Sequence, residues 1–139
     1  MPYQLGWIVP KRVILTQFSG NISKDELIRY AMQMQREISS GDSPVYHISD
    51  SLNLGKVELS LGAVQKLIRT LPSFKALSWQ VDINRPGLNT MLAALGSQFA
   101  GVRTRTFATQ TEAVAFLKSV DETLERAVWS DTPTPVDTL

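Results

Sequence analysis

The chain has 139 residues, of which 43% are hydrophobic and 19% charged, and its 14 Lys and Arg nearly balance 13 Asp and Glu. This length fits one compact domain, and a net charge of +1 does not predict a surface for polyanions such as nucleic acid. The absence of cysteine excludes disulfides, thiolate nucleophiles and cysteine zinc sites, and a single histidine disfavours His-based catalysis. We therefore predict no cofactor, no metal and no enzymatic activity.

The first forty residues predict a β-hairpin followed by a helix. Residues 3–9 and 12–19 are rich in β-branched and aromatic side chains, and Pro10-Lys11 separates them. Ser23 and Glu26 have the spacing of a capping box, in which each side chain accepts a hydrogen bond from the other residue's backbone N–H. The helix that follows has one apolar face, formed by Leu27, Tyr30, Ala31, Met34 and Ile38.

A short strand, a loop and a second helix are expected next. The strand is predicted over 45–50 and the helix over 60–71, where Pro72 ends it. The loop between them, 51–59, carries four aliphatic residues and is therefore expected to fold onto the core or onto a partner. These residues are Leu52, Leu54, Val57 and Leu59.

The second half of the chain repeats the strand–helix alternation. Strands are predicted over 76–83 and 102–108, with a helix from Leu88 to about Phe99 between them. Thr109 and Glu112 have capping-box spacing and open a last helix that extends to Leu124. We assign residues 1–126 to a single domain and expect 127–139 to be a mobile C-terminal tail, because its Thr, Pro and Asp content is high.

The predicted order is ββαβαβαβα, which favours an α/β fold with a mixed, mostly parallel five-stranded sheet. In 76–83, apolar residues alternate with Ser78, Gln80 and Asp82. A sheet with helices packed on both faces would show continuous apolar strands instead. We therefore expect helices mainly on one face, and a part-polar opposite face that is available to a partner.

Three local patterns accompany this order of elements. They are Phe18-Ser19-Gly20-Asn21-Ile22-Ser23 before the first helix, Asp50-Ser51 at the end of the third strand, and Arg103-x-Arg105-x-Phe107 followed by Glu112-Ala113-x-x-Phe116-Leu117. Together they resemble the STAS domain of bacterial anti-sigma-factor antagonists, especially SpoIIAA-like single-domain proteins, over residues 3–125. The resemblance implies a βα superhelix and a regulatory or protein-interaction function.

The resemblance also implies candidate phosphorylation sites. In the regulatory members, a partner kinase phosphorylates a serine at the start of the helix after the third strand. Ser51 matches this serine, and Ser60 at the helix start is the second candidate. Read from the residues alone, Ser51 is a turn residue and Ser60 a helix cap. The implied partner is a kinase or an anti-sigma-like regulator, and a homodimer is the other possibility.

A second group of residues predicts a small-ligand site. Free backbone amides at the helix start near Asn84, Arg85 and Gly87 favour an anion, and Arg85 adds a positive charge. Asp50 would lie at the same edge of the sheet, and Leu52 and Leu54 would supply an apolar wall. The alternative function is therefore a carrier or sensor of an apolar or anionic ligand, a lipid or a nucleotide, held between 51–59 and 84–88.

Two further readings concern acidic and basic side chains. Asp50 and Asp82 could together hold Mg²⁺ if neighbouring strands bring them together, although solvated turn residues are the default interpretation. His47 is expected to be a packed residue and not a base. No secretory signal and no apolar run of about 20 residues is found, so we expect a cytoplasmic protein without a membrane span.

Overall fold

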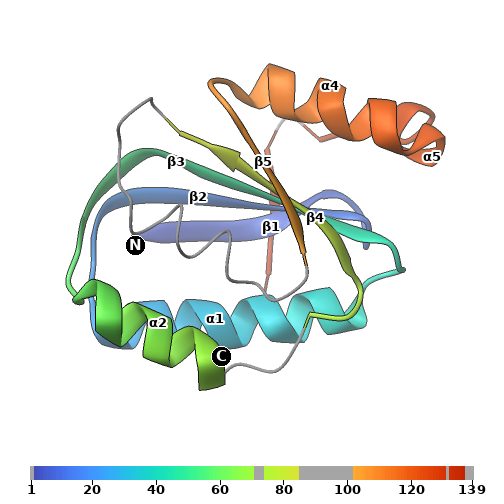
Figure 1. Ribbon diagram of the computed structural model, residues 1–139. Helices are drawn as coiled ribbons and strands as arrows, with labels where there is room; N and C mark the ends of the chain where they lie inside the picture. The colour runs from blue at the N-terminus through green and yellow to red at the C-terminus, as the bar shows by residue number, and fades with distance from the viewer. Residues whose placement is uncertain (1, 71–73, 85–101, 131, 137–139) are drawn as a thin grey trace.

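The computed structural model describes residues 2–70, 74–84, 102–130 and 132–136. Among these residues, six strands form one sheet in the order β5-β4-β3-β2-β1-β6 (Figure 1). β1 is antiparallel to both β2 and β6, and all other neighbours are parallel. The strands are β1 (Tyr3–Val9), β2 (Val13–Ile22), β3 (Val45–Val57), β4 (Leu77–Ile83), β5 (Arg103–Phe107) and β6 (Thr134–Pro135).

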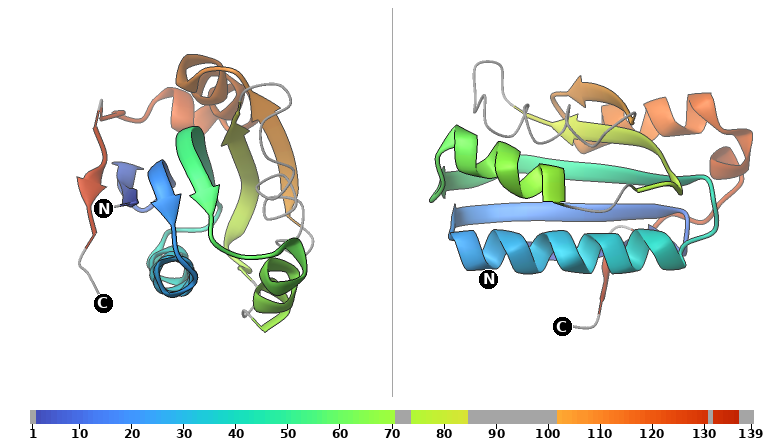
Figure 2. Two further views of the ribbon diagram at one scale, coloured as in Figure 1. Left: turned by 90° about the vertical axis from the view of Figure 1, so that its left-hand side faces the viewer. Right: turned by 60° about the horizontal axis from the view of Figure 1, so that its bottom comes forward.

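The described helices lie on two sides of this sheet (Figure 2). Helices α1 (Lys24–Ser40) and α2 (Leu61–Thr70) pack on one face, and α4 (Gln110–Val120) with the short α5 (Glu122–Glu125) lies on the other. The predicted α/β class and the mostly parallel sheet are confirmed. The predicted helix over 88–99 lies outside the described residues.

Helix α1 begins where the capping box predicted. The Ser23 hydroxyl accepts a hydrogen bond from the Glu26 N–H at 3.2 Å, and the Glu26 carboxylate accepts one from the Ser23 N–H at 3.0 Å. The buried face of α1 includes the predicted apolar positions Leu27, Tyr30, Ala31, Met34 and Ile38. Local capping and helical periodicity are therefore sufficient to locate this helix.

Two apolar cores fill the spaces above and below the sheet. The core under α1 contains alternate side chains of β1 and β2 with the buried face of the helix, including Tyr3, Phe18 and Met34. The opposite core, under α4, contains the other set of strand residues together with Leu117 and Leu124. Because successive side chains of a strand point to opposite faces, both faces of the same strands are buried.

Strand β3 corrects the prediction of a loop over 51–59. It continues without a break to Val57, which pairs in register with Ile22 at the end of β2. Register shifts on the way reverse which face a residue meets, so Leu52 packs in the core under α4 and Leu54 in the core under α1. At one of these shifts the Asn21 side-chain oxygen accepts a hydrogen bond from the Lys56 N–H at 2.8 Å, so this backbone donor has a partner. Bulges break the alternation of apolar residues, which explains why the sequence pattern did not indicate a strand.

Asp121 divides the predicted last helix into α4 and α5. Its carboxylate caps α5 by accepting the Thr123 N–H at 2.9 Å, and it also accepts hydrogen bonds from Arg12 at 2.8 Å and the Tyr46 hydroxyl at 2.7 Å. The Thr123 side chain and these other donors lower the pKa of Asp121 to about 2. This carboxylate therefore joins the end of α4 to the sheet.

The segment after α5 also differs from the prediction of a separate tail. The Ser130 N–H donates to the Ile8 carbonyl at 2.8 Å, and the Val136 N–H donates to the Leu5 carbonyl at 3.1 Å. Between them, β6 pairs with the centre of β1. The described part of 127–139 is thus attached to the sheet, which a Thr- and Pro-rich composition did not indicate.

Replacing Gly6 with alanine is expected to detach β6 while the rest of the domain stays folded. A Cβ atom at Gly6 would lie 2.1 Å from the backbone oxygen of Thr134, a distance at which β6 must move. We expect the Val136 amide to exchange with solvent about tenfold faster or more, measured by hydrogen–deuterium exchange. Gly62→Ala in α2 is the control, because a Cβ there meets nothing within 4 Å. Unchanged protection of Val136 in Gly6→Ala would contradict the described pairing.

Candidate functional site

A chain of buried polar side chains crosses the sheet beneath α1. The parallel register places Thr16 of β2 beside Ser49 of β3, and Ser49 beside Asp82 of β4. Two residues earlier in each strand, His47 of β3 lies beside Gln80 of β4. All these side chains are buried, with His47 1% and Asp82 5% exposed. Sequence reasoning placed Gln80 and Asp82 on an open face for a partner, and that prediction is wrong because this face is covered.

Hydrogen bonds connect four of these residues, Thr16, His47, Gln80 and Asp82, with Tyr30 of α1. The Thr16 hydroxyl lies 2.9 Å from the Tyr30 hydroxyl and 2.8 Å from His47 Nε2. On the other side of the ring, His47 Nδ1 lies 2.6 Å from Gln80 Oε1, and Gln80 Nε2 donates to Asp82 Oδ1 at 2.9 Å. An amide oxygen only accepts, so Nδ1 carries the proton and Nε2 accepts from a hydroxyl. We call these residues, Tyr30, Thr16, His47, Gln80 and Asp82, the buried polar chain.

Burial sets the charges in the buried polar chain. Loss of solvent lowers the pKa of His47 to about 4, although the Gln80 hydrogen bond opposes this shift. Loss of solvent also raises the pKa of Asp82 to about 6, again opposed by Gln80, and raises the pKa of Tyr30. At neutral pH the chain therefore contains a neutral imidazole, a neutral phenol and one carboxylate at its end. His47 is a packed residue, as its position in a strand predicted.

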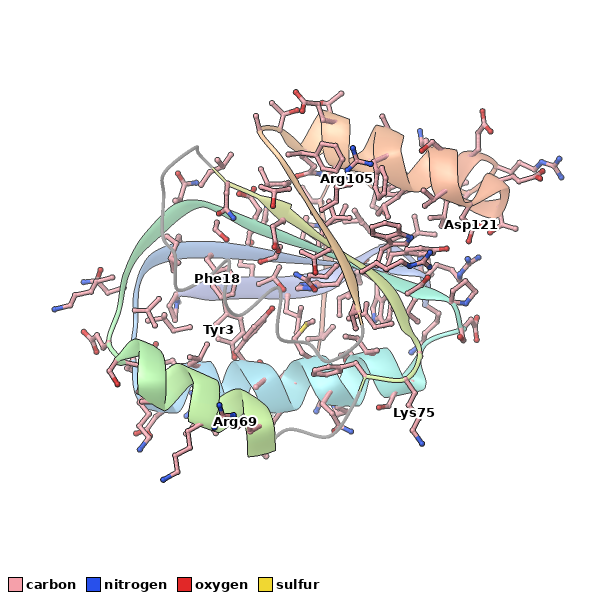
Figure 3. The ribbon with its side chains drawn as sticks, viewed as in Figure 1. Tyr3, Phe18, Arg69, Lys75, Arg105 and Asp121 are labelled. Carbon is pink, nitrogen blue, oxygen red and sulfur yellow. The ribbon has the colours of Figure 1, made fainter. Side chains whose placement is uncertain are left out.

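A second buried pair borders this chain at the α1 side. The Tyr3 hydroxyl donates to the Gln33 amide oxygen, and the Tyr3 ring makes an edge contact with the Tyr30 ring at 5.0 Å between centroids. Phe18 contacts the other side of the same ring at 5.1 Å. Figure 3 shows Tyr3 and Phe18 in the space between the sheet and α1. These contacts fix the Tyr30 hydroxyl toward Thr16.

The two candidate serines lie in very different surroundings. Ser51 is part of β3, and only 1% of it is exposed. Ser60 is exposed and precedes α2, where its hydroxyl accepts the Ala63 N–H at 3.1 Å. The reading of Ser60 as a helix cap is therefore confirmed, whereas the reading of Ser51 as a turn residue is wrong.

The two aspartates that could have shared Mg²⁺ point to opposite faces of the sheet. Asp50 pairs in register with Ile83, which packs in the core under α4, whereas Asp82 belongs to the face under α1. The Asp50 carboxylate instead accepts the Leu52 N–H at 3.1 Å. Among the described residues, no group of three His, Asp or Glu could hold a metal ion.

The predicted ligand residues are only partly described. Asn84 follows β4, where its N–H donates to the Phe107 carbonyl at 3.1 Å, and its buried side-chain Oδ1 has no hydrogen-bond partner among the described residues. Arg85 and Gly87 lie outside the described residues. Leu52 and Leu54 contact opposite cores, so they do not form the common apolar wall that was expected.

A surface hollow of about 420 Å³ lies elsewhere, between α4 and the segment after α5. Val114, Lys118 and Trp129 are among its lining residues, and the Lys118 ammonium lies 5.6 Å from the centre of the Trp129 ring. The four predicted ligand residues that the structure describes, Asp50, Leu52, Leu54 and Asn84, do not line this hollow. None of the described helices is long and apolar enough to cross a membrane.

Comparisons with known proteins identify the fold. No protein-family model and no curated protein matches the sequence. The structure is similar to an uncharacterized protein of the DUF3478 family from Shewanella loihica PV-4, with a TM-score of 0.56 and 14% identity over 76% of this chain and 83% of that chain. It is also similar to the unphosphorylated anti-sigma factor antagonist SpoIIAA, with a TM-score of 0.56 and 15% identity over 86% of this chain and 98% of that chain. The sheet order, the helix placement and these two likenesses lead to one conclusion: the chain has a SpoIIAA-like, STAS-type fold.

Proposed function

We propose that this protein is a regulatory module that acts by binding another protein and catalyses no reaction. The observation that carries this proposal is the likeness to SpoIIAA over 98% of that chain, since SpoIIAA is an anti-sigma factor antagonist and such a protein acts on another protein. The whole domain, and not a fragment of it, shares that architecture.

The surroundings of the ionisable groups support the same proposal. Burial lowers the pKa of His47 to about 4 and raises the pKa of Asp82 to about 6. Both side chains are enclosed beneath α1. A general base must come within hydrogen-bond distance of its substrate, directly or through one water. The donors and acceptors of the buried polar chain instead form hydrogen bonds that connect β2, β3, β4 and α1.

In-cell crosslinking followed by mass spectrometry tests this function. The chain, tagged at one end and expressed in its source organism, is expected to crosslink to one protein whose purified form binds the purified chain in a 1:1 complex by light scattering. A self-crosslink with a dimer mass would identify the homodimer instead. Turnover of a small molecule that is lost in a folded His47→Gln variant would contradict the proposal, because it would make the protein an enzyme.

A phosphorylation switch within this proposal favours Ser60 over Ser51. A kinase needs the hydroxyl of its substrate in solvent, and Ser60 is exposed while Ser51 is enclosed in β3. A phosphate at a helix start is also stabilised by the free backbone amides and the helix dipole. Incubation with a cognate kinase is expected to add phosphate at Ser60 and none at Ser51.

The ligand carrier remains the alternative function. Asp50 lies within β3 beside Ile83, the last residue of β4, and Asn84 follows Ile83. The buried Oδ1 of Asn84, which has no partner among the described residues, is a polar group that a ligand could satisfy. Native mass spectrometry of freshly purified protein tests it. A bound lipid or nucleotide lost in Asn84→Ala would favour the carrier, and a spectrum of the bare chain would favour the protein-binding module.

A further inference from the structure

The surface hollow beside α4 is lined by side chains from three parts of the chain. Residues four apart in a helix lie on the same side, so Gln110, Val114 and Lys118 form one row along α4. Ile8 of β1 and Trp129 of the segment after α5 also line the hollow. Figure 2 shows this segment running from the helices to β6 at the edge of the sheet. At about 420 Å³ the hollow is within the range of small-ligand pockets, which is about 300–1,000 Å³.

Part of this hollow is an apolar surface whose side chains are held in place. Ile8 is only 1% exposed, and Val114 and the half-buried Trp129 pack against the same core under α4. The Trp129 indole N–H donates to the Leu124 carbonyl at 2.8 Å, which fixes the orientation of the ring. A fixed ring beside packed aliphatic groups favours a flat apolar ligand, because the protein loses little conformational freedom when the two come into contact.

A positive charge lies beside this apolar surface. The Lys118 ammonium is 5.6 Å from the centre of the Trp129 ring, and it forms no ion pair with a carboxylate of the described residues. Lys118 is half-buried, so water screens its charge less than that of a fully exposed lysine. An ammonium binds a carboxylate through charge-assisted hydrogen bonds, which are stronger than those between neutral groups. The hollow therefore combines a fixed aromatic ring with a cation that attracts an anion.

A second lysine–tryptophan pair offers a comparison within the same molecule. The Lys11 ammonium is 5.7 Å from the centre of the Trp7 ring, and it donates to the Ser40 hydroxyl at 3.4 Å. Trp7 is only 9% exposed, and neither Lys11 nor Trp7 lines the hollow. The two pairs thus have the same side chains at nearly the same distance, but only the pair of Lys118 and Trp129 borders this hollow.

We propose that the hollow beside α4 binds a small aromatic carboxylate, with its ring against Trp129 and Val114 and its carboxylate paired with Lys118. This inference goes beyond the proposed protein-binding function, and the site is separate from Asp50 and Asn84 of the alternative function. A cationic ligand would be repelled by Lys118, and a neutral one would leave the ammonium without a partner. A lysine can also serve only to cover an aromatic ring with its apolar stem, and the test separates that role.

Three naphthalene probes that differ in charge test the proposal by NMR of the indole N–H signals. The chain has three tryptophans, and the variant Trp129→Phe assigns the signal of Trp129. We expect 2-naphthoate to shift this signal with a Kd of about 1 mM or tighter, as is usual for a ligand of this size, and to leave the Trp7 signal unchanged. The neutral 2-naphthalenemethanol should bind about fivefold more weakly, and the cationic 2-naphthalenemethanamine more weakly still.

Two pairs of variants supply the matched controls. Lys118→Met should bring the affinities for the acid and the alcohol within about twofold of each other, whereas Lys11→Met should keep the ratio of about fivefold. Ala115→Phe places a ring in the hollow and should abolish the shift of the Trp129 signal. Ser119→Phe adds the same ring to α4 outside the hollow and should leave the Kd within about twofold. Ala115 and Ser119 are both exposed, and thermal unfolding checks that each variant is folded.

Several results would overturn the proposal. They are no shift of the Trp129 signal with 2-naphthoate at about tenfold the expected Kd, equal shifts of the Trp7 and Trp129 signals, or an unchanged ratio of acid to alcohol affinity in Lys118→Met. Equal loss of binding in Ala115→Phe and Ser119→Phe, or tighter binding of the amine, would overturn it as well. These measurements use the purified chain alone, so their failure leaves the protein-binding function standing. A failure to find a crosslinked partner would remove that function and leave this site unaffected.

Discussion

Ser51→Asp is expected to lower the free energy of unfolding by at least about 3 kcal/mol, because it places a carboxylate without a described cationic partner inside the sheet. Ser51 is 1% exposed and lies in β3 between β2 and β4. Part of the cost is avoided if the new carboxyl is protonated, so the loss should be largest at neutral and alkaline pH. Urea unfolding followed by circular dichroism at pH 7.5 measures it.

Ser60→Asp is the matched control for this substitution. Ser60 caps α2 through the Ala63 N–H, and aspartate caps a helix start equally well with a favourable charge. We expect a change within about 0.5 kcal/mol, whereas Ser60→Ala should cost about 1 kcal/mol. Ser51→Ala separates the effect of the charge from that of the lost hydroxyl. If Ser51→Asp were as stable as the wild type, Ser51 would not be enclosed and would return as a phosphorylation site.

Asp82→Asn is expected to raise the free energy of unfolding at pH 7 by about 1–3 kcal/mol. Burial raises the pKa of Asp82 from 3.8 to about 6, and each unit of this difference corresponds to about 1.4 kcal/mol of cost to the ionised form. An amide keeps the oxygen that accepts from Gln80 Nε2 and removes the charge. The N–H groups of the new amide cost free energy if they find no acceptor, and this cost lowers the expected gain toward about 1 kcal/mol. Urea unfolding at pH 7 is the measurement.

The pH dependence of the unfolding free energy tests the assigned charges of Asp82 and His47 more directly. Because the folded pKa of Asp82 is raised, its stabilising contribution is complete below about pH 3.8 and is lost as the pH rises through about 6. The folded pKa of His47 is lowered to about 4, so its contribution is complete above about pH 6.5 and is lost as the pH falls through about 4. Between about pH 4 and 6 the two contributions therefore oppose each other in the wild type.

Only the His47 contribution remains in Asp82→Asn. The stability gain of this variant over the wild type should therefore shrink from pH 7 toward pH 4, and its unfolding free energy should fall by up to about 3 kcal/mol from the His47 contribution over that interval. Other carboxylates with lowered pKa values, such as Asp121 and Glu26, are common to both proteins and cancel in the difference. A constant difference between the two proteins from pH 4 to 7 would contradict the assigned charges.

Local signals predicted the helices better than they predicted the long strand. The Ser23–Glu26 capping box and the apolar stripe of α1 depend on residues within one or two turns, so they are visible in the sequence. β3 extends beyond Asp50 because bulges are matched across β2, a partner far away in the chain. The Asn, Gly and Lys residues at these bulges look locally like a loop.

The buried polar chain required information that no local pattern contains. Alternation in β4 indicated that Gln80 and Asp82 share one face, but the sequence does not say which face α1 covers. The contact between His47 and Gln80 depends on the parallel register of β3 and β4, two strands that are joined by the crossover through α2. The contacts of Arg103 with Trp79 and of Arg105 with Phe116 were missed for a similar reason, since the second of them forms only after α4 folds back across β5.

The pairing of β6 with β1 has a consequence for folding during synthesis. β6 is synthesised roughly 125 residues after β1, an interval of about 6–25 s at usual rates of translation. Throughout this interval the outer edge of β1 lacks the strand that covers it in the finished sheet. Nascent chains that meet on the same polysome could therefore join through this edge, and the late arrival of residues 132–136 ends that exposure.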